Sequence, residues 1–397
     1  MSGLDVLEAE GFDRLKGHRV GVLTNHSGIN RRGEHIIDLL TAHGVEIVAL
    51  FSPEHGIRGT EDAYVSSGVD EKTGLPIFSL YGQRRKPTSS MLEGIDTLVC
   101  DIQDIGARFY TYHSTMGLCM EAARECGGIK VIVLDRPNPI RGNWFDGPIQ
   151  DDDLVGGFTA FRHMPVAHGM TMGELALFIN RFSGRMQDQP GVGCDLEVVP
   201  MKGWRRDMFF DQTGLPWVNP SPNMRSVEEE LLYTMVALTE SNKVVSVGRG
   251  TDRPFEYLGA PWMDGKALGA DLRRRNLPGL WVMDVEFFVP ERDAFGRAVP
   301  GSYPFRGEVC QGVRLTITDR EAFSPLEAGL HMLHALKNVG GERYMEGWDR
   351  MRGLLGAGWA LEELRQGRPV DEIVRKWRTQ PEFKAFAKAR RSVLLYK

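Results

Sequence analysis

The sequence predicts an α/β protein in which a Rossmann-like, mostly parallel sheet is followed by a smaller α+β domain. Three observations support this prediction. Short apolar runs alternate with helical patterns through the N-terminal third of the chain. Each run is apolar along its whole length, as expected for strands covered on both faces of a parallel sheet. The chain of 397 residues is also longer than one ordinary core supports, so two domains are expected.

The N-terminal part supplies the predicted parallel strands and the helices that connect them. Helical patterns lie between successive apolar runs, which favours right-handed crossovers. Strands are expected at residues 19–24, 45–51, 96–102 and 130–135, with helices around 36–40 and 114–126. A helix at 172–183 follows, because Thr171 and Glu174 have the spacing of a capping box. A further strand is expected at 195–200.

The second half of the chain begins after a rigid loop. Prolines at 216, 220 and 222 cannot continue a helix or a central strand, so residues 217–223 are predicted to form that loop. A helix containing Leu231 and Leu238 follows, and the domain boundary is placed at residue 235, which gives domains 1–235 and 236–397. Expected C-terminal elements are strands at 281–289 and 311–318 and helices at 325–338, 357–366 and 370–378.

Charge and composition exclude several classes of partner. The formal net charge is −5, so the chain has no basic field that would attract nucleic acid or an anionic membrane. The sequence contains no apolar run of about 18 residues, the length of a membrane span. No secretory signal is visible, so a cytoplasmic location is expected, or a secreted or periplasmic one if a leader was removed. Neither GxGxxG nor GxxxxGKS follows the first strand, and no cofactor is predicted.

Polar clusters follow four of the predicted parallel strands. Because the carboxyl ends of such strands meet at one edge of the sheet, these clusters are expected to surround a ligand site. The clusters contain Asn25 after the first strand, Glu54, His55 and Arg58 after the second, Asp101, Gln103, Asp104, Arg108, Tyr110 and Tyr112 at the third, and Asn138 after the fourth.

Glu54 is the leading catalytic candidate. Its carboxyl group lies in a glycine-rich loop at a strand end, where partial desolvation raises a pKa and allows a group to act as an acid near neutrality. The alternative is a loop carboxylate that caps a helix or pairs with Arg58.

The third strand end supplies further carboxylates. A glycosidase needs two carboxyl groups about 5–10 Å apart, and neighbouring loops carrying Glu54, Asp101 and Asp104 satisfy that need. Tyr110 and Tyr112 are suited to stacking on a sugar. The alternative is a structural network in which Asp104 and Arg108 neutralise each other.

Other candidate sites are weaker. His26, His55, His113 and His168 show no metal-ligand spacing, so no metal is predicted. Arg249 lies between two glycines, which favours a bidentate contact with a carboxylate, although an interface brace is the alternative. No GxSxG elbow is present, which disfavours a serine nucleophile.

Seven motifs, in order along the chain, resemble one family. They are SPEHGIRG, GLPIFSLYG, DIQDIGARFYTY, LDRPNPIRG, PVAHGMTMGELA, LPWVNPSPNM and SVGRGTDRPFEYLGAPW. Together they resemble the bacterial exo-β-N-acetylmuramidase family, glycoside hydrolase family 171, formerly a domain of unknown function. The resemblance extends from about Gly3 to the final Leu-Leu-Tyr.

The resemblance implies a cleft between two domains and release of terminal N-acetylmuramic acid from the non-reducing end of peptidoglycan fragments. Glu54 would be the acid, with Asp101, Asp104 or Tyr110 as second partner, or with the substrate's own acetamido group assisting. Arg58, Arg108 or Arg249 would bind the lactyl carboxylate. Further implied substrate-binding residues are Asn25, His55, Gln103, Tyr112, Asn138 and Asn223. A metal-assisted hydrolase and a non-catalytic muropeptide-binding protein remain alternatives, and no oligomeric state is predicted.

Overall fold

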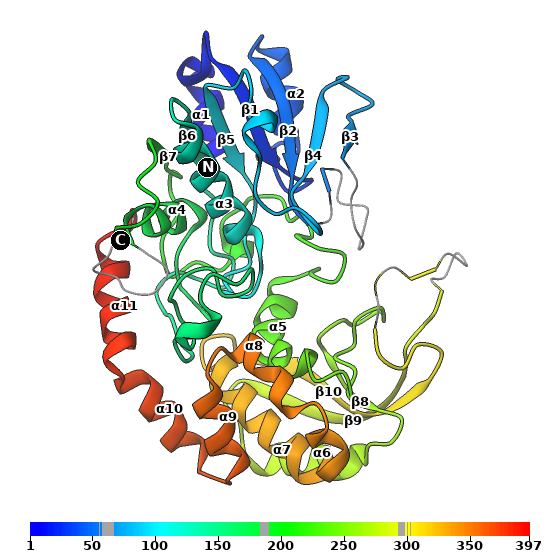
Figure 1. Cartoon of the computed structure of the whole chain (residues 1–397). Coiled ribbons are helices and arrows are strands. Elements are labelled where there is room, and N and C mark those ends of the chain that lie inside the picture. The colour runs from blue at the N-terminus through cyan, green and yellow to red at the C-terminus, as the bar shows by residue number, and fades with distance from the viewer. Residues whose placement is uncertain (55, 58–66, 183–189, 293–297, 300, 302) are drawn as a thin grey trace.

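The computed structural model describes residues 1–397 except 55, 58–66, 183–189, 293–297, 300 and 302. It contains two sheets, which lie in the upper and lower parts of the molecule in Figure 1. The upper sheet has seven strands in the order β3-β4-β2-β1-β5-β6-β7, and the lower has three in the order β8-β10-β9. The predicted two-domain α/β architecture is therefore confirmed.

Six strands of the upper sheet run parallel, and the short β3 is antiparallel to β4. The strands are β1 (Arg19–Thr24), β2 (Glu46–Ser52), β3 (Gly68–Val69), β4 (Pro76–Ser79), β5 (Thr97–Asp101), β6 (Lys130–Leu134) and β7 (Leu196–Val199). The four strands expected at the centre, β1, β2, β5 and β6, are neighbours in space. Their polar ends therefore meet at one edge of the sheet.

Helices cover both faces of the upper sheet. They are α1 (Gly3–Ala9), α2 (Ile36–Ala42), α3 (Tyr112–Cys126) and α4 (Met172–Arg181). Leu4 and Ile36 bring α1 and α2 into one core with Val20, whereas Met116 and Leu175 bring α3 and α4 into the other. The sheet is thus buried on both sides, which explains its uniformly apolar strands.

The lower part surrounds an antiparallel sheet with helices. Its elements are α5 (Val227–Glu240), β8 (Tyr257–Ala260), α6 (Gly265–Arg274), β9 (Leu280–Phe288), β10 (Val309–Ile317), α7 (Pro325–Met345), α8 (Arg352–Leu355), α9 (Gly358–Arg365), α10 (Val370–Thr379) and α11 (Pro381–Arg391). The sequence patterns missed β8, α6 and α11. They predicted the remaining long elements within a few residues, except that α7 continues seven residues beyond its predicted end.

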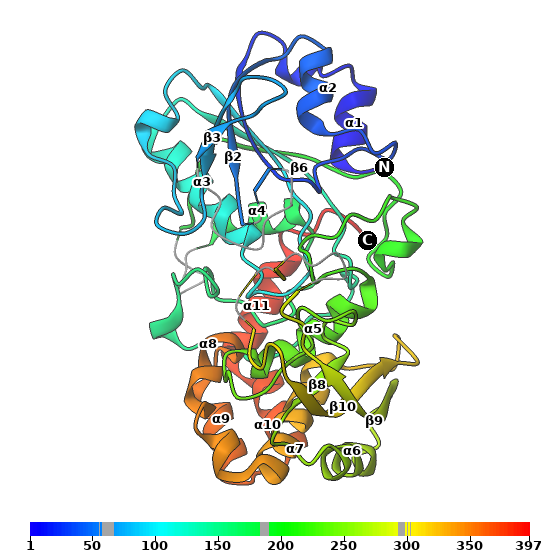
Figure 2. The ribbon, with the colours of Figure 1, turned by 90° about the vertical axis from the view of Figure 1, so that its right-hand side faces the viewer.

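The C-terminal helices return to the upper domain. Figures 1 and 2 show α10 and α11 running from the lower part of the molecule up to the sheet. There the Tyr396 hydroxyl donates to Asp135 Oδ2 at 2.5 Å and accepts from the Met201 amide at 2.7 Å. The chain therefore connects the two domains twice, once through the segment before α5 and once through α11.

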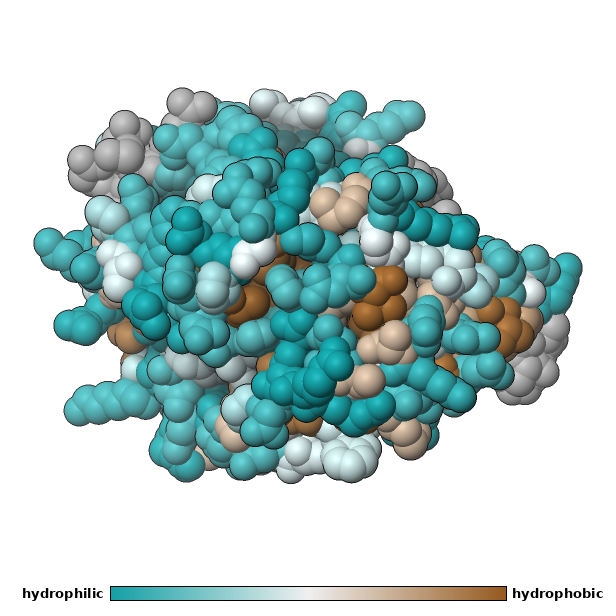
Figure 3. Space-filling view, turned by 90° about the horizontal axis from the view of Figure 1, so that it is seen from below, coloured by the Kyte–Doolittle hydropathy of each residue, from teal (hydrophilic) through white to brown (hydrophobic). Residues whose placement is uncertain are grey.

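The surface is predominantly hydrophilic in the view from below, with apolar residues in separate spots (Figure 3). None of the helices in the described ranges has both the length and the apolar character needed to cross a bilayer.

Candidate active site

The candidate site is built where the upper sheet meets α5. The loops after β1, β2, β5 and β6 meet at the sheet edge that faces the lower domain (Figure 1). On the other side, Tyr233 of α5 packs edge-on against Phe109, with 5.4 Å between the ring centres. The site therefore lies at the strand ends, between the domains, as expected for an open parallel sheet.

Glu54 is partly exposed at the end of β2. Its Oε2 accepts a hydrogen bond of 3.3 Å from the hydroxyl of Thr111, the residue that precedes α3. The negative charge of Glu54 contributes to the raised pKa values of Tyr110 and Tyr112, whose main cause is burial. The carboxyl group therefore lies against the loop that leads into α3, with one side of it open.

Asp104 is nearly buried and is held by the loop around it. Its Oδ2 lies 3.1 Å from His168 Nε2 and accepts from the Gly106 amide at 2.9 Å. Because His168 Nδ1 accepts from the Met170 amide, Nε2 carries the proton that is donated to Asp104. Burial alone would raise the pKa of Asp104, but the hydrogen bonds from His168 and from the Gly106 amide lower it. Asp104 is therefore ionised.

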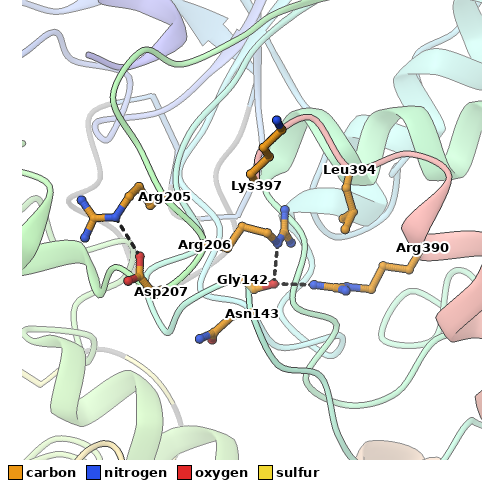
Figure 4. A pocket seen from close by; sticks show the side chains of 8 residues that line it. All are labelled: Gly142, Asn143, Arg205, Arg206, Asp207, Arg390, Leu394 and Lys397. Carbon is orange, nitrogen blue, oxygen red and sulfur yellow. Dashed lines mark hydrogen bonds and ion pairs between the residues drawn. The ribbon is translucent and has the colours of Figure 1, made fainter.

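Arg390 of α11 supports the backbone behind His168. Its guanidinium donates to the carbonyl oxygens of His168 and Gly169, and both Arg390 and Arg206 bind the carbonyl oxygen of Gly142 (Figure 4). Gly142, Arg206 and Arg390 line a pocket of about 490 Å³. Burial and the nearby Arg206 charge lower the pKa of Arg390 to about 10. The returning C-terminal helix thus fixes the loop that orients Asp104.

Asp101 does not face the candidate site. Its side chain is fully buried, and both carboxylate oxygens bind the guanidinium of Arg136, at 2.5 and 2.8 Å. Arg136 also donates to the Ile29 carbonyl at 2.9 Å. This pair joins the loops after β5, β6 and β1. The expectation that Asp101 shares one open hollow with Glu54 was wrong, because an arginine from the next strand end occupies both of its oxygens.

The polar amides of the strand-end loops mainly hold those loops together. Gln103 donates to the carbonyl oxygens of Asp104 and Pro137 at 2.7 and 2.8 Å, and Asn138 donates to that of Met170 at 3.1 Å. Asn25 Oδ1 accepts from the amide and hydroxyl of Ser27. All three amide side chains are buried. Their described contacts support the loops, and substrate binding by these residues stays a prediction.

Arg108 is fully buried and is directed away from Asp104. It donates to the carbonyl oxygens of Thr159, Leu354 and Leu355, which ties the β5 loop to the lower domain. Burial lowers the pKa of Arg108 to about 10. The interpretation that Arg108 and Asp104 neutralise each other was wrong, because Arg108 binds carbonyl oxygens and Asp104 binds His168. The burial of Arg108 does not favour its contact with a substrate carboxylate, which stays a prediction.

Tyr110 and Tyr112 pack against each other, with ring centres 4.7 Å apart. Tyr112 is 1 % exposed and its hydroxyl donates to the Pro220 carbonyl at 2.7 Å. Tyr110 is 8 % exposed. Neither ring offers an open face on which a sugar could stack, so that expectation was also wrong. The two rings form the packed support beneath Glu54.

Arg249 and Asn223 bring the lower domain to the site. Arg249 is half-buried, and its Nη1 lies 2.5 Å from Glu240 Oε1. Asn223 accepts from the Gly250 amide at 3.2 Å, which fixes the loop carrying Arg249. Burial raises the pKa of Tyr233, and the charges of Glu240, Arg249 and Glu54 all act on it. The charges of Arg249 and Glu54 therefore both act on this one buried side chain of α5.

A glycine next to Arg249 permits this arrangement. Gly250 has φ +83°, and a Cβ there would lie 2.9 Å from the ring of Tyr303. The Arg249 guanidinium lies 5.2 Å from the centre of the same ring. The glycine thus lets this loop pack closely on Tyr303, and the predicted approach of Arg249 to a ligand carboxylate stays a prediction.

Glu230 is a member of the site that the sequence interpretation missed. It lies on α5 and is fully buried, and neither carboxyl oxygen has a hydrogen-bond partner in the described part of the chain. The sequence did contain a signal for Glu230. Glu230, Tyr233 and Ala237 have the spacing of one helix face, and the residues around them in this helix are mostly apolar.

Two candidates, His55 and Arg58, lie outside the described residues. Within the residues that the structure does describe, no three His, Cys, Asp or Glu side chains form a group suited to a metal ion.

The fold and the site define a two-domain α/β protein with a partly exposed carboxyl group at the strand ends and an arginine of the second domain near it. Comparisons with known proteins agree with this class. Residues 20–228 match the family described as exo-β-N-acetylmuramidase NamZ, N-terminal, and residues 231–396 match its C-terminal counterpart. The chain belongs to the NamZ exo-β-N-acetylmuramidase family.

Individual relatives span the whole chain. It is 39% identical to the peptidoglycan β-N-acetylmuramidase NamZ of Bacillus subtilis, over 100% of this chain and 91% of that protein. Two crystal structures of DUF1343 family proteins from Bacteroides fragilis are also similar. One has 34% identity and a TM-score of 0.86, with 100% of this chain and 98% of that chain covered. The other has 32% identity and a TM-score of 0.79, with 100% and 99% covered.

Proposed function

We propose that this protein is an exo-acting glycoside hydrolase that releases terminal N-acetylmuramic acid from the non-reducing end of peptidoglycan fragments. Membership of the NamZ family over both domains and the name of the Bacillus subtilis relative support this function. The observation in the structure that carries it is the partly exposed carboxyl group of Glu54 at the strand ends, which accepts a hydrogen bond from the Thr111 hydroxyl. A muramic acid glycoside needs both an acid for the leaving oxygen and a cation for its lactyl carboxylate.

Glu54 is the proposed general acid. It is the strand-end carboxyl group that stays partly exposed, whereas Asp101 and Asp104 are bound by Arg136 and His168. Glu54 donates its proton to the glycosidic oxygen, the hydroxyl of a water molecule adds to the anomeric carbon, and the remaining proton of that water restores the acid. Thr111 holds Oε2 and leaves the other oxygen available to the substrate.

The proposed activity is tested on muropeptides that end in N-acetylmuramic acid or in N-acetylglucosamine at the non-reducing end. We expect free N-acetylmuramic acid from the first substrate and very slow turnover of the second. We expect activity to persist after dialysis against a chelator. Release of internal fragments would contradict the exo mode. Tight binding without turnover would instead support a muropeptide-binding protein, and loss of activity with the chelator would support the metal-assisted alternative.

Arg249 is the proposed receptor for the lactyl carboxylate, because Arg108 is sealed and Arg249 is half-buried beside the site. Arg249→Met should lower kcat/KM for an N-acetylmuramic acid glycoside by about 10- to 100-fold, the loss expected for a charge-assisted hydrogen bond. The residual rate on an N-acetylglucosamine glycoside should change little, because that sugar has no lactyl group.

The matched control is Arg253→Met, in the same loop, because Arg253 contacts Glu256 and is more exposed. It should leave both rates unchanged. Equal losses on the two sugars in Arg249→Met would show that Arg249 supports the fold of the loop without reading the carboxylate.

A further inference from the structure

Glu230 is a buried carboxyl group without a compensating charge. It is 0% exposed, and both of its oxygens lack a hydrogen-bond partner among the described residues. An ionised carboxylate left unpaired in a protein interior is far more costly than a neutral carboxylic acid. The position of Glu230 on α5 therefore favours the acid form, which can both donate and accept a hydrogen bond.

The side of α5 that carries Glu230 faces the loop after β5. Glu230 lies one helical turn before Tyr233, so the two side chains leave the helix on the same face. Tyr233 packs on Phe109, the neighbour of Tyr110, with 5.4 Å between ring centres. Asp104 lies at the start of the same loop. The packing of α5 thus turns the helix face that carries Glu230 toward the loop after β5.

Two polar atoms of that loop are unsatisfied as well. Asp104 Oδ1 and the Tyr110 hydroxyl are buried and lack a partner within the described residues, although the Tyr110 and Tyr112 hydroxyls lie near one another. Electrostatic interactions also connect Glu230, Asp104 and Tyr110. Burial and then the charge of Asp104 raise the pKa of Glu230, and Glu230 and Glu54 both contribute to raising that of Tyr110. The charges of Glu230 and Glu54 therefore both act on the Tyr110 hydroxyl.

We propose that Glu230 is a positioning residue that keeps one proton, donates it toward Asp104 Oδ1 and accepts a hydrogen bond from the side of the Tyr110 hydroxyl, each through an ordered water. The three groups are complementary, because an ionised Asp104 only accepts, a tyrosine hydroxyl donates, and a carboxylic acid does both. Two neighbouring buried carboxyl groups do not both ionise, and His168 keeps the charge on Asp104. Glu230 acts on the reaction through Tyr110 and Glu54.

The proton on Glu230 is tested by infrared spectroscopy without any substrate. The other charged neighbour on α5 is Glu229, whose pKa is raised by burial to about 7, as is that of Asp135. At about pH 8.5 both of those groups are almost fully ionised. We expect a protonated carboxyl band at that pH which shifts in deuterium oxide, is absent in Glu230→Gln and is retained in Glu229→Gln. Absence of the band in the native protein would overturn the proposal.

The positioning role is tested by kinetics, and this arm rests on the proposed function. Glu230→Gln keeps a donor and an acceptor, so kcat should stay within about threefold of the native value. Glu230→Leu leaves Asp104 Oδ1 and the Tyr110 hydroxyl unsatisfied, so kcat should fall by about 10- to 100-fold, with KM changed less than about twofold. Glu229→Gln, the neighbouring carboxyl group, should behave as the native protein.

The outcomes separate the two proposals. An unchanged kcat in Glu230→Leu, or an equal loss in Glu230→Gln, would overturn the positioning role. If the native protein does not hydrolyse muramic acid glycosides, the proposed function fails, while the infrared band still decides whether Glu230 holds a proton. If Glu230→Leu does not fold, the Gln variant with normal kcat and no band supports the proposal, and the Gln variant with impaired kcat contradicts it.

Discussion

Replacing Glu54 by glutamine is expected to lower kcat for a muramic acid glycoside by about 10²- to 10⁴-fold, the usual contribution of a general acid. The amide cannot supply the proton that the leaving oxygen needs. Glu54 is partly exposed and its described hydrogen bond is the 3.3 Å contact with Thr111, so the unfolding temperature should hardly change. Steady-state rates and thermal melts of the purified variant measure both quantities.

The choice of leaving group makes this test specific for acid catalysis. An aryl glycoside with an acidic phenol needs little protonation, so Glu54→Gln should lose much less activity on it than on a sugar leaving group. Glu93→Gln is a suitable control, because Glu93 is exposed and lies before β5, at the other end of the strands. Equal losses on both substrates, or nearly normal hydrolysis of the natural linkage, would exclude Glu54 as the acid.

Asp101→Asn is expected to destabilise the protein by about 3–5 kcal/mol, the cost of leaving one member of a buried ion pair without its partner. Arg136 would keep its charge at a place where its side chain is only 6% exposed. The loops after β1, β5 and β6 would lose their common connection. Chemical denaturation, followed by tryptophan fluorescence, measures the change in the free energy of unfolding.

A double variant separates the lost pair from a general intolerance of substitution. Asp101→Leu combined with Arg136→Met removes both charges and should recover a substantial part of the lost stability. If Asp101→Asn instead unfolds like the native protein and loses only activity, Asp101 has a catalytic role that its contact with Arg136 does not reveal.

Glu54 and Asp101 show how much of the candidate site could be predicted from the sequence. Position 54 follows β2 and position 101 is the last residue of β5, and the parallel order of the strands places both at one edge of the sheet. That much follows from local patterns. Whether the Asp101 carboxylate is accessible to a ligand depends on Arg136. This arginine is 35 positions from Asp101 in the sequence and reaches it only through the pairing of β5 with β6. Such a long-range contact has no local signal.

The helix α5 illustrates a second kind of limit. Three consecutive acidic residues, Glu228, Glu229 and Glu230, open this helix, and acidic residues in a first turn are usually explained by the helix dipole. Glu228 and Glu229 fit that explanation, since one binds Arg320 and the other accepts from the Arg225 amide. Glu230 differs only in its direction, which the packing of α5 on the β5 loop determines. The pattern predicted the helix but did not distinguish its three carboxyl groups.

The return of α11 to the sheet also restricts how the two domains can move relative to each other. Two domains that are joined by a single segment of chain can change their relative orientation in many directions. Here the hydrogen bond between Tyr396 and Asp135 fastens the end of the chain to the first domain, which adds a second connection between the domains. A second connection restricts the ways in which the two domains can move apart, so the loops that carry Glu54 and Arg249 are expected to keep a more constant relative position than a single connection would allow.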